Sequence, residues 1–347
     1  MNDNRYQSEP IRRYRGKRRR NPFRTALLAV MTALIVIGAV IYIMSLTGTG
    51  LFSDRASDDT PETVDPGQTE AETVETEPEE TEPETKDLGE IVYRYLDKEQ
   101  KAIHEGDLVL INKEHIYTFP AISLVSMKEY STPSYALSMS TMKLRADVIE
   151  IFNKMMDDFA RATGFTDAIV TSAHRSFDIQ ESLYASNPTG AAKPGYSDYH
   201  TGTTVMVQGI TSTGGLFSLS GRQEAMWLKE NAHKYGFIFR YPSNKKALTG
   251  YELPWQLRYV GIPHAGVMYE EDLCLEEYLE TMATSHPYAG EHLIIKGGDG
   301  LTYEIYYVMA GEEGITKVPV PENRAYSLSG DNLHGFLVAI SVEEELK

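Results

Sequence analysis

The sequence predicts an α+β fold with a small β unit at its C-terminal end, behind one N-terminal transmembrane helix. With 347 residues, 41% of them hydrophobic and 24% charged, the chain exceeds one compact domain and is too polar for a multi-span membrane protein. Residues 26–46 contain no charged side chain. From residue 91 onward, helix-like and strand-like hydrophobic patterns follow one another, and after residue 291 only short strand-like runs remain.

The N-terminal region has the features of a cytoplasmic tail and a membrane anchor. Residues 1–25 carry nine basic side chains against two acidic ones, which predicts a cytoplasmic N-terminus. At about 1.5 Å per residue, residues 26–46 can cross a bilayer core of roughly 30 Å. This stretch is longer than the roughly 7–15 apolar residues of a cleaved signal peptide, so we predict an uncleaved single-pass anchor.

Residues 47–90 are predicted to form an acidic linker rich in Pro, Thr and Glu. Fifteen acidic residues, two basic residues and four prolines occur between residues 51 and 90, a composition that cannot bury a core.

The formal net charge of the whole chain is −17, which argues against a nucleic-acid partner. The single cysteine, Cys274, excludes an intrachain disulfide and a cysteine-rich zinc module.

Residues 91–285 are predicted to form the main domain and residues 286–347 a β-rich extension. Apolar residues at helical spacing predict a helix over 142–163, and two more helices are expected from Phe177 and over 222–235. Short apolar runs predict buried strands in the main domain at 168–170 and 237–239 and in the extension at 301–308 and 336–340.

Three stretches, in this order, resemble the VanY-type zinc D,D-carboxypeptidases of bacterial cell-wall metabolism, which are related to hedgehog and lysostaphin-type domains. They are SAHRS at 172–176 with Gln180, PGYSDYHTG at 194–202, and YELPWQLRYVG at 251–261. The resemblance covers roughly residues 105–280 and implies a VanY/hedgehog-like peptidase domain.

The resemblance also implies which positions would hold zinc, and this chain departs from the family at each of them. Family members read Ser-X-His-X-X-Gly-X-Ala-X-Asp and Glu-Pro-Trp-His, with two histidines and an aspartate as ligands and the glutamate as general base. Aligned without a gap, this chain has Tyr199, Met206 and Gln256 at the ligand positions and Leu253 at the base position. Phenol, thioether and carboxamide groups are poor zinc ligands at neutral pH. We therefore predict no catalytic residue, no metal ligand and no cofactor.

Two neighbouring residues offer a way to rebuild the site. His200 lies one residue after a ligand position, and Glu252 lies one residue before the base position. In an extended chain a shift of one residue turns a side chain to the opposite face. We therefore expect neither side chain to reach the site.

The substrate-holding part of the family pattern persists. In the family, the arginine at the position of Arg175 helps to hold the peptide substrate, and Ser176, Gln180 and Ser197 match motif positions nearby. Together with Trp255, these residues are the predicted ligand-binding set. The alternative is that Arg175 caps or pairs with groups of the fold itself and that the cleft binds no ligand.

The resemblance and the replaced positions together predict a non-catalytic, membrane-anchored VanY-like protein whose folded domain is extracytoplasmic. Its predicted partner is a peptidoglycan stem peptide, or else a cell-envelope protein for which it acts as a scaffold. An active D-alanyl-D-alanine carboxypeptidase acting on stem peptides is the alternative that the resemblance alone would favour.

Overall fold

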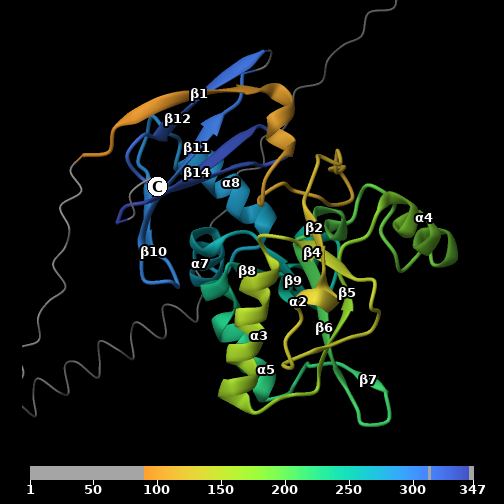
Figure 1. Ribbon diagram of the computed structural model, residues 1–347. Helices are drawn as coiled ribbons and strands as arrows, with labels where there is room; N and C mark the ends of the chain where they lie inside the picture. Colours follow the sequence, from red (N-terminus) through yellow and green to blue (C-terminus); the bar gives the residue numbers. More distant parts are fainter. Residues whose placement is uncertain (1–89, 312–313, 344–347) are drawn as a thin grey trace, which may run out of the picture. The chain divides into compact units, whose positions relative to one another are not determined.

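The computed structural model describes residues 90–311 and 314–343 (Figure 1). The predicted cytoplasmic tail, the predicted anchor and nearly all of the predicted linker lie outside these ranges. Among the described residues, no helix is both long enough and apolar enough to cross a bilayer.

A mixed sheet with the strand order β3-β5-β6-β9-β8 forms the centre of the main domain, and β7 pairs with β6. Only the pair β3–β5 is parallel. The strands are β3 (Ala136–Leu137), β5 (Ala168–Ser172), β6 (Thr204–Ile210), β7 (Leu216–Phe217), β8 (Phe237–Tyr241) and β9 (Leu253–Tyr259). The predicted strands at 168–170 and 237–239 are therefore confirmed, and each extends by two residues.

Helices α3 (Ile149–Thr163) and α5 (Glu224–Asn231) share one core cluster with β5, β6 and β9. Buried apolar side chains recur on α3 at helical spacing, and Gly164 ends the helix in the left-handed conformation with φ 71°. The predicted helix over 142–163 thus begins seven residues later than expected. Residues Lys143–Arg145 form strand β4 instead, because they pair with β2 (Leu124–Ser126).

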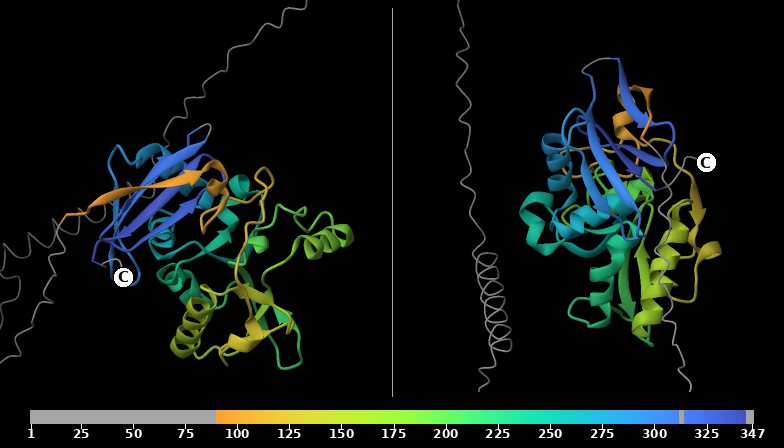
Figure 2. Two further views of the ribbon diagram at one scale, coloured as in Figure 1. Left: turned by 45° about the horizontal axis from the view of Figure 1, so that its top comes forward. Right: turned by 90° about the vertical axis from the view of Figure 1, so that its left-hand side faces the viewer.

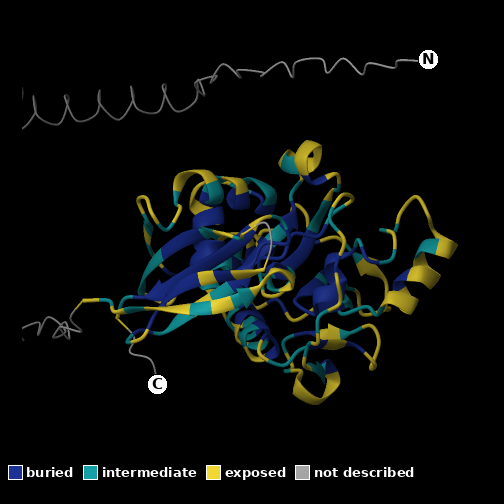
Figure 3. Ribbon diagram, turned by 90° about the horizontal axis from the view of Figure 1, so that it is seen from above, coloured by how far each residue is buried: buried dark blue, intermediate teal, exposed yellow. Residues whose placement is uncertain are grey.

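The other helices are short and lie around the sheet. They are α2 (Met127–Tyr130), α4 (Phe177–Ser186), α6 (Lys246–Thr249), α7 (Ile262–Glu270) and α8 (Leu275–Ser285). Helix α4 extends away from the rest of the domain and is mostly exposed (Figures 2 and 3). Only Gln180 of α4 is buried, so this helix contributes one polar side chain to the interior rather than an apolar face.

The C-terminal strands form an antiparallel sheet in the order β10-β11-β14-β13, beside the pair β1–β12 (Figure 1). Their bounds are β1 (Tyr93–Glu99), β10 (Leu293–Lys296), β11 (Thr302–Met309), β12 (Ile315–Pro321), β13 (Tyr326–Gly330) and β14 (Gly335–Ser341). The predicted runs at 301–308 and 336–340 are confirmed as β11 and β14.

The first strand of the described chain belongs to this C-terminal group. β1 pairs with β12 over seven residue pairs, from Tyr93–Pro321 to Glu99–Ile315. The predicted division at residue 286 therefore separates two strands that are hydrogen-bonded to each other. Such long-range pairing leaves no local signal in the sequence around residues 93–99.

The C-terminal sheet also shares a core with the main domain. Side chains from α7, α8, β11 and β14 belong to one buried cluster that includes Leu108 and Ile238. Backbone and side-chain hydrogen bonds join Leu110 to Asp331 and Asn332. The β extension is therefore packed against the segment that precedes the motifs and against Ile238 of β8.

Candidate functional site

A cavity of about 350 Å³ lies where the three family-like stretches meet. It is lined by all four positions at which the family's zinc ligands and base would stand, Tyr199, Met206, Leu253 and Gln256. Arg175 and Ser197, from the predicted ligand-binding set, line the same cavity. The structure therefore brings together six residues that the sequence separates by up to 81 positions.

Strand register explains how the replaced positions meet. Met206 of β6 lies directly opposite Gln256 of β9 in the antiparallel pair, so both side chains emerge on the same face. Val205 and Leu257, the neighbouring pair, point to the opposite face and are fully buried in the core. Tyr199 lies in the 3-10 helix Asp198–Thr201, which precedes β6. At this point of the sheet, β6 and β9 thus present Met206 and Gln256 to the cavity and Val205 and Leu257 to the core.

The donor set at these positions does not fit zinc. A catalytic zinc site needs three imidazole, carboxylate or thiolate ligands. Burial raises the pKa of Tyr199, which keeps its phenol protonated at neutral pH. Met206 offers only a thioether and Gln256 only a carboxamide. Within residues 90–311 and 314–343, no group of three or more His, Cys, Asp or Glu side chains is placed to share a metal ion.

His200 is held away from the cavity by two hydrogen bonds. Its Nδ1 donates to the carbonyl oxygen of Arg175 at 2.7 Å, and its Nε2 accepts from the backbone N–H of Gly195 at 3.0 Å. Burial lowers the pKa of His200, in keeping with a neutral ring that uses one nitrogen as donor and the other as acceptor. Neither ring nitrogen is available to a metal.

Glu252 differs from expectation, because its residue lines the cavity. It precedes the first residue of β9, Leu253, so the alternation of a regular strand does not govern its direction. Its Oε2 pairs with Lys246 Nζ at 3.0 Å, and this hydrogen bond lowers the pKa of the Glu252 carboxyl. A carboxylate committed to Lys246 at the exposed rim is a poor base for chemistry at Gln256.

Arg175 faces the cavity with most of its hydrogen-bonding capacity unused. Its guanidinium donates to Ser172 Oγ at 2.8 Å and to Gln180 Oε1 at 3.2 Å, and it lies 4.1 Å from the centre of the Tyr199 ring. Both acceptors are neutral, and no described carboxylate forms an ion pair with Arg175. Burial lowers the pKa of Arg175, but an arginine remains charged at any physiological pH.

Three of the five predicted ligand-binding side chains do not line the cavity. Ser176 caps α4 by accepting the backbone N–H of Ile179 at 3.3 Å. Gln180 is fully buried and links Arg175 to the carbonyl oxygen of Ala192. Trp255 lies in the core cluster and donates to Ser220 Oγ, because it stands on the face of β9 opposite to Gln256. In this structure these three side chains support the fold around the cavity, and their contact with a ligand stays a prediction.

A buried ionic cluster at the cavity, around the lining residue Asp198, was missed by sequence reasoning. Asp198, which is 1% exposed, contacts Arg258, Arg240 and the Tyr241 hydroxyl. Arg240 also forms two hydrogen bonds with Glu276, at 2.8 and 2.9 Å. Two arginines inside the largely apolar strands β8 and β9 are the signal that such a partner exists, because a buried charge needs one. The cluster fixes the 3-10 helix that carries Tyr199.

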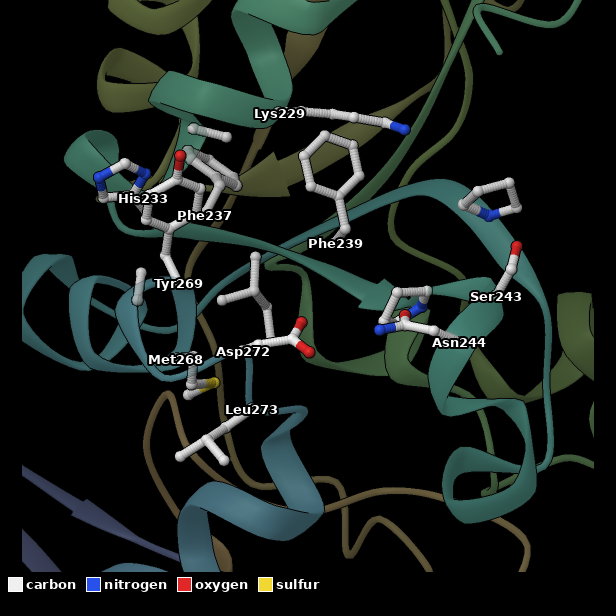
Figure 4. Close-up of a pocket in the computed structure, with 15 residues that line it drawn as sticks. Lys229, His233, Phe237, Phe239, Ser243, Asn244, Met268, Tyr269, Asp272 and Leu273 are labelled. Atoms are coloured by element: carbon white, nitrogen blue, oxygen red, sulfur yellow. The ribbon is translucent and has the colours of Figure 1, made fainter. Parts of the chain in front are cut away.

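A second cavity, of about 480 Å³, lies between α5, β8 and α7 (Figure 4). It is mainly apolar, with Phe239 and Met268 in its wall and with the rings of His233 and Tyr269 stacked 3.8 Å apart. From the three family-like stretches it includes only Pro254. It is therefore distinct from the site that the motifs build.

Comparison with known proteins gives the same family that the three stretches resemble. Residues 141–262 match the family model described as VanY, D-alanyl-D-alanine carboxypeptidase. A D-alanyl-D-alanine carboxypeptidase of Enterococcus faecium is 31% identical over 247 residues, covering 70% of this chain and 77% of the relative. The putative carboxypeptidase YodJ of Bacillus subtilis is 30% identical over 276 residues, covering 74% of this chain and 95% of the relative.

A solved structure shows the same fold. The vancomycin resistance D,D-dipeptidase VanXYg, crystallised with a D-Ala-D-Ala phosphinate analogue, superimposes with a TM-score of 0.62 at 23% identity. The match covers 72% of this chain and 99% of that one. The cavity therefore lies in a fold that VanXYg shares and in a sequence region that matches carboxypeptidases, and the chain belongs to the VanY family of D-alanyl-D-alanine carboxypeptidases.

Proposed function

We propose that this chain is a non-catalytic member of the VanY family that binds the carboxyl end of cell-wall stem peptides. One observation carries the proposal. Arg175 faces a cavity of about 350 Å³ without a carboxylate partner among the described residues. The positions at which the family carries its zinc ligands and general base are occupied by Tyr199, Met206, Leu253 and Gln256. A guanidinium fork can bind a carboxylate through two parallel hydrogen bonds.

The replaced residues support loss of hydrolysis. Without a metal ion, the pKa of water stays far above neutral, whereas zinc-bound water has a pKa near 7. Leu253 cannot accept a proton, and Glu252 is paired with Lys246. The names of the relatives indicate a ligand that ends in D-alanine. The competing proposals are an active carboxypeptidase, which family membership favours, and a scaffold for a cell-envelope protein.

The Arg175 proposal predicts that the ligand's free carboxylate is essential. The full chain, purified in detergent, should bind a stem peptide with a free C-terminal carboxylate more tightly than the same peptide amidated. A charge-assisted hydrogen bond contributes about 1.5–3 kcal/mol, so amidation should weaken binding by roughly tenfold to 150-fold. Ligand-observed NMR titration measures both affinities and reaches the millimolar range.

Matched variants separate binding from folding. Arg175→Ala should remove the preference for carboxylate over amide, and Arg175→Lys should restore only part of it, because lysine keeps the charge but lacks the planar fork. Equal binding of both peptides by the native chain would refute the role of Arg175. No binding by any stem peptide, together with a lower melting temperature for Arg175→Ala, would favour the scaffold.

We further propose that residues 26–46 anchor the chain in the cell membrane, with residues 1–25 cytoplasmic and the acidic linker and folded domain outside. The charge distribution and the uncharged length of 26–46 support this topology. Protease added to intact spheroplasts should remove the folded domain and leave a short membrane-embedded fragment. A protected domain would reverse the orientation, and a soluble chain that starts after about residue 46 would indicate a cleaved signal.

A further inference from the structure

Gln256 is a buried side chain with an unused acceptor beside the cavity. The residue is 1% exposed, it lines the cavity, and its Oε1 has no hydrogen-bond partner among the described residues. Its cross-strand neighbour Met206 and the nearby Leu253 offer no N–H or O–H donor from their side chains. The fold therefore leaves the side-chain carbonyl oxygen unsatisfied in a residue that lines the cavity.

The same domain contains a buried glutamine, Gln180, in which both the oxygen and the nitrogen of the carboxamide have a hydrogen-bond partner, and this contrast is informative. Gln180 Oε1 accepts from Arg175, and Gln180 Nε2 donates to the Ala192 carbonyl oxygen at 2.7 Å. Most buried polar side-chain atoms in native proteins have such partners, and an unpaired one destabilises the fold. An apolar residue of similar length at position 256 would avoid that penalty. An unpaired acceptor next to a cavity points to a partner that arrives with a ligand.

The missing partner must be an N–H or O–H donor, and a peptide ligand supplies one beside its carboxylate. The last peptide N–H lies only two bonds from the terminal carboxylate carbon. The Oε1 atom of a glutamine carboxamide is an acceptor, so it can accept the N–H of that peptide bond. We infer that Gln256 recognises the last peptide bond of the bound stem peptide, an inference that rests on the proposed carboxylate-binding role of Arg175.

This assignment changes the role of the position. In the family pattern the residue aligned with Gln256 is a histidine that binds zinc. Here a carboxamide would instead form a hydrogen bond to the last peptide bond of the bound peptide. The cavity would then select ligands with an amide at the last linkage. An ester at that linkage has no N–H and places an oxygen where Oε1 needs a donor.

The test compares a peptide with two analogues, in each of which an oxygen replaces one peptide N–H. Each ligand is titrated into the full chain and followed by ligand-observed NMR. The three ligands are a stem peptide with a free carboxylate, its analogue with an ester at the last linkage, and an analogue with an ester at the preceding linkage. We expect the first ester to bind roughly tenfold more weakly than the peptide, as loss of a buried hydrogen bond predicts. The second ester is the matched control and should bind like the peptide.

Two variants assign the effect to Gln256. Gln256→Met, a change of similar length without hydrogen-bonding groups, should reduce the amide-to-ester ratio to about one. It should retain the carboxylate preference due to Arg175 and keep or raise the melting temperature. Gln223→Met, at an exposed position away from the cavity, should change none of these.

The possible failures are distinguishable. If the native chain binds the last-linkage ester as well as the peptide but still prefers carboxylate to amide, the inference is wrong and the proposed function stands. The same holds if the ester penalty survives in Gln256→Met or occurs only at the preceding linkage. If no peptide binds, both the inference and the peptide-binding function are overturned.

Discussion

Replacing Asp198 by asparagine is expected to destabilise the folded domain by about 3–5 kcal/mol, the usual cost of removing one partner from a buried ionic cluster. Arg258 and Arg240 have fully buried side chains and both contact Asp198. Without the negative charge at position 198, Arg258 would be left with neutral acceptors, among them the carbonyl oxygens of Asp107 and Val109. Chemical denaturation of the native and Asp198→Asn chains, followed by circular dichroism, measures the difference.

Glu276→Gln is the matched control. Arg240 would lose one charged partner but keep Asp198, and the Glu276 side chain is 16% exposed, so water can compensate in part. We expect a clearly smaller loss than for Asp198→Asn. If the two variants are equally stable, or if Asp198→Asn costs less than about 1 kcal/mol, the cluster does not hold the site in place.

The largest expected gain follows from rebuilding the family's residues at the four replaced positions. The change Tyr199→His, Met206→Asp, Leu253→Glu and Gln256→His would place two imidazoles and two carboxylates around one cavity. We expect the variant to bind zinc at about one ion per chain. At zinc concentrations a thousandfold above Kd, binding should stabilise the fold by about 4 kcal/mol. Elemental analysis and thermal unfolding with and without zinc measure the two effects.

The triple variant that retains Met206 is the control for this experiment. With only two histidines at ligand positions, it should bind zinc much more weakly, because a catalytic site uses three protein ligands. If the quadruple variant folds but takes up no zinc, the four side chains do not converge as the lining of the cavity indicates. The ungapped alignment of these positions would then be wrong.

Local patterns in the sequence predicted the elements that bury apolar side chains. The helix that became α3 and the strands β5, β8, β11 and β14 were predicted because their hydrophobic residues repeat at the right spacing. The pairing of β1 with β12 joins segments more than 200 residues apart, so no local pattern could reveal it. Lys143–Arg145 was misassigned for the same reason, since its strand depends on β2.

The sequence predicted those residues of the site that align with the family's motifs. The alignment placed Arg175, Ser197 and the four replaced positions around one cavity. It could not separate residues that line the cavity from those that support it, as Trp255 and Gln180 illustrate. Nor could it show that Gln256 Oε1 lacks a partner, because hydrogen-bond satisfaction depends on the packed neighbours.

The most direct test of the central claim is the release of D-alanine from a stem pentapeptide by the native chain supplied with zinc. The quadruple variant, once shown to bind zinc, indicates whether a metal at this site can act on the same peptide. For the native chain, the absence of zinc ligands and of a free base predicts no release above a blank without protein. Release that is abolished by a chelator and restored by zinc would contradict the account and identify an active carboxypeptidase.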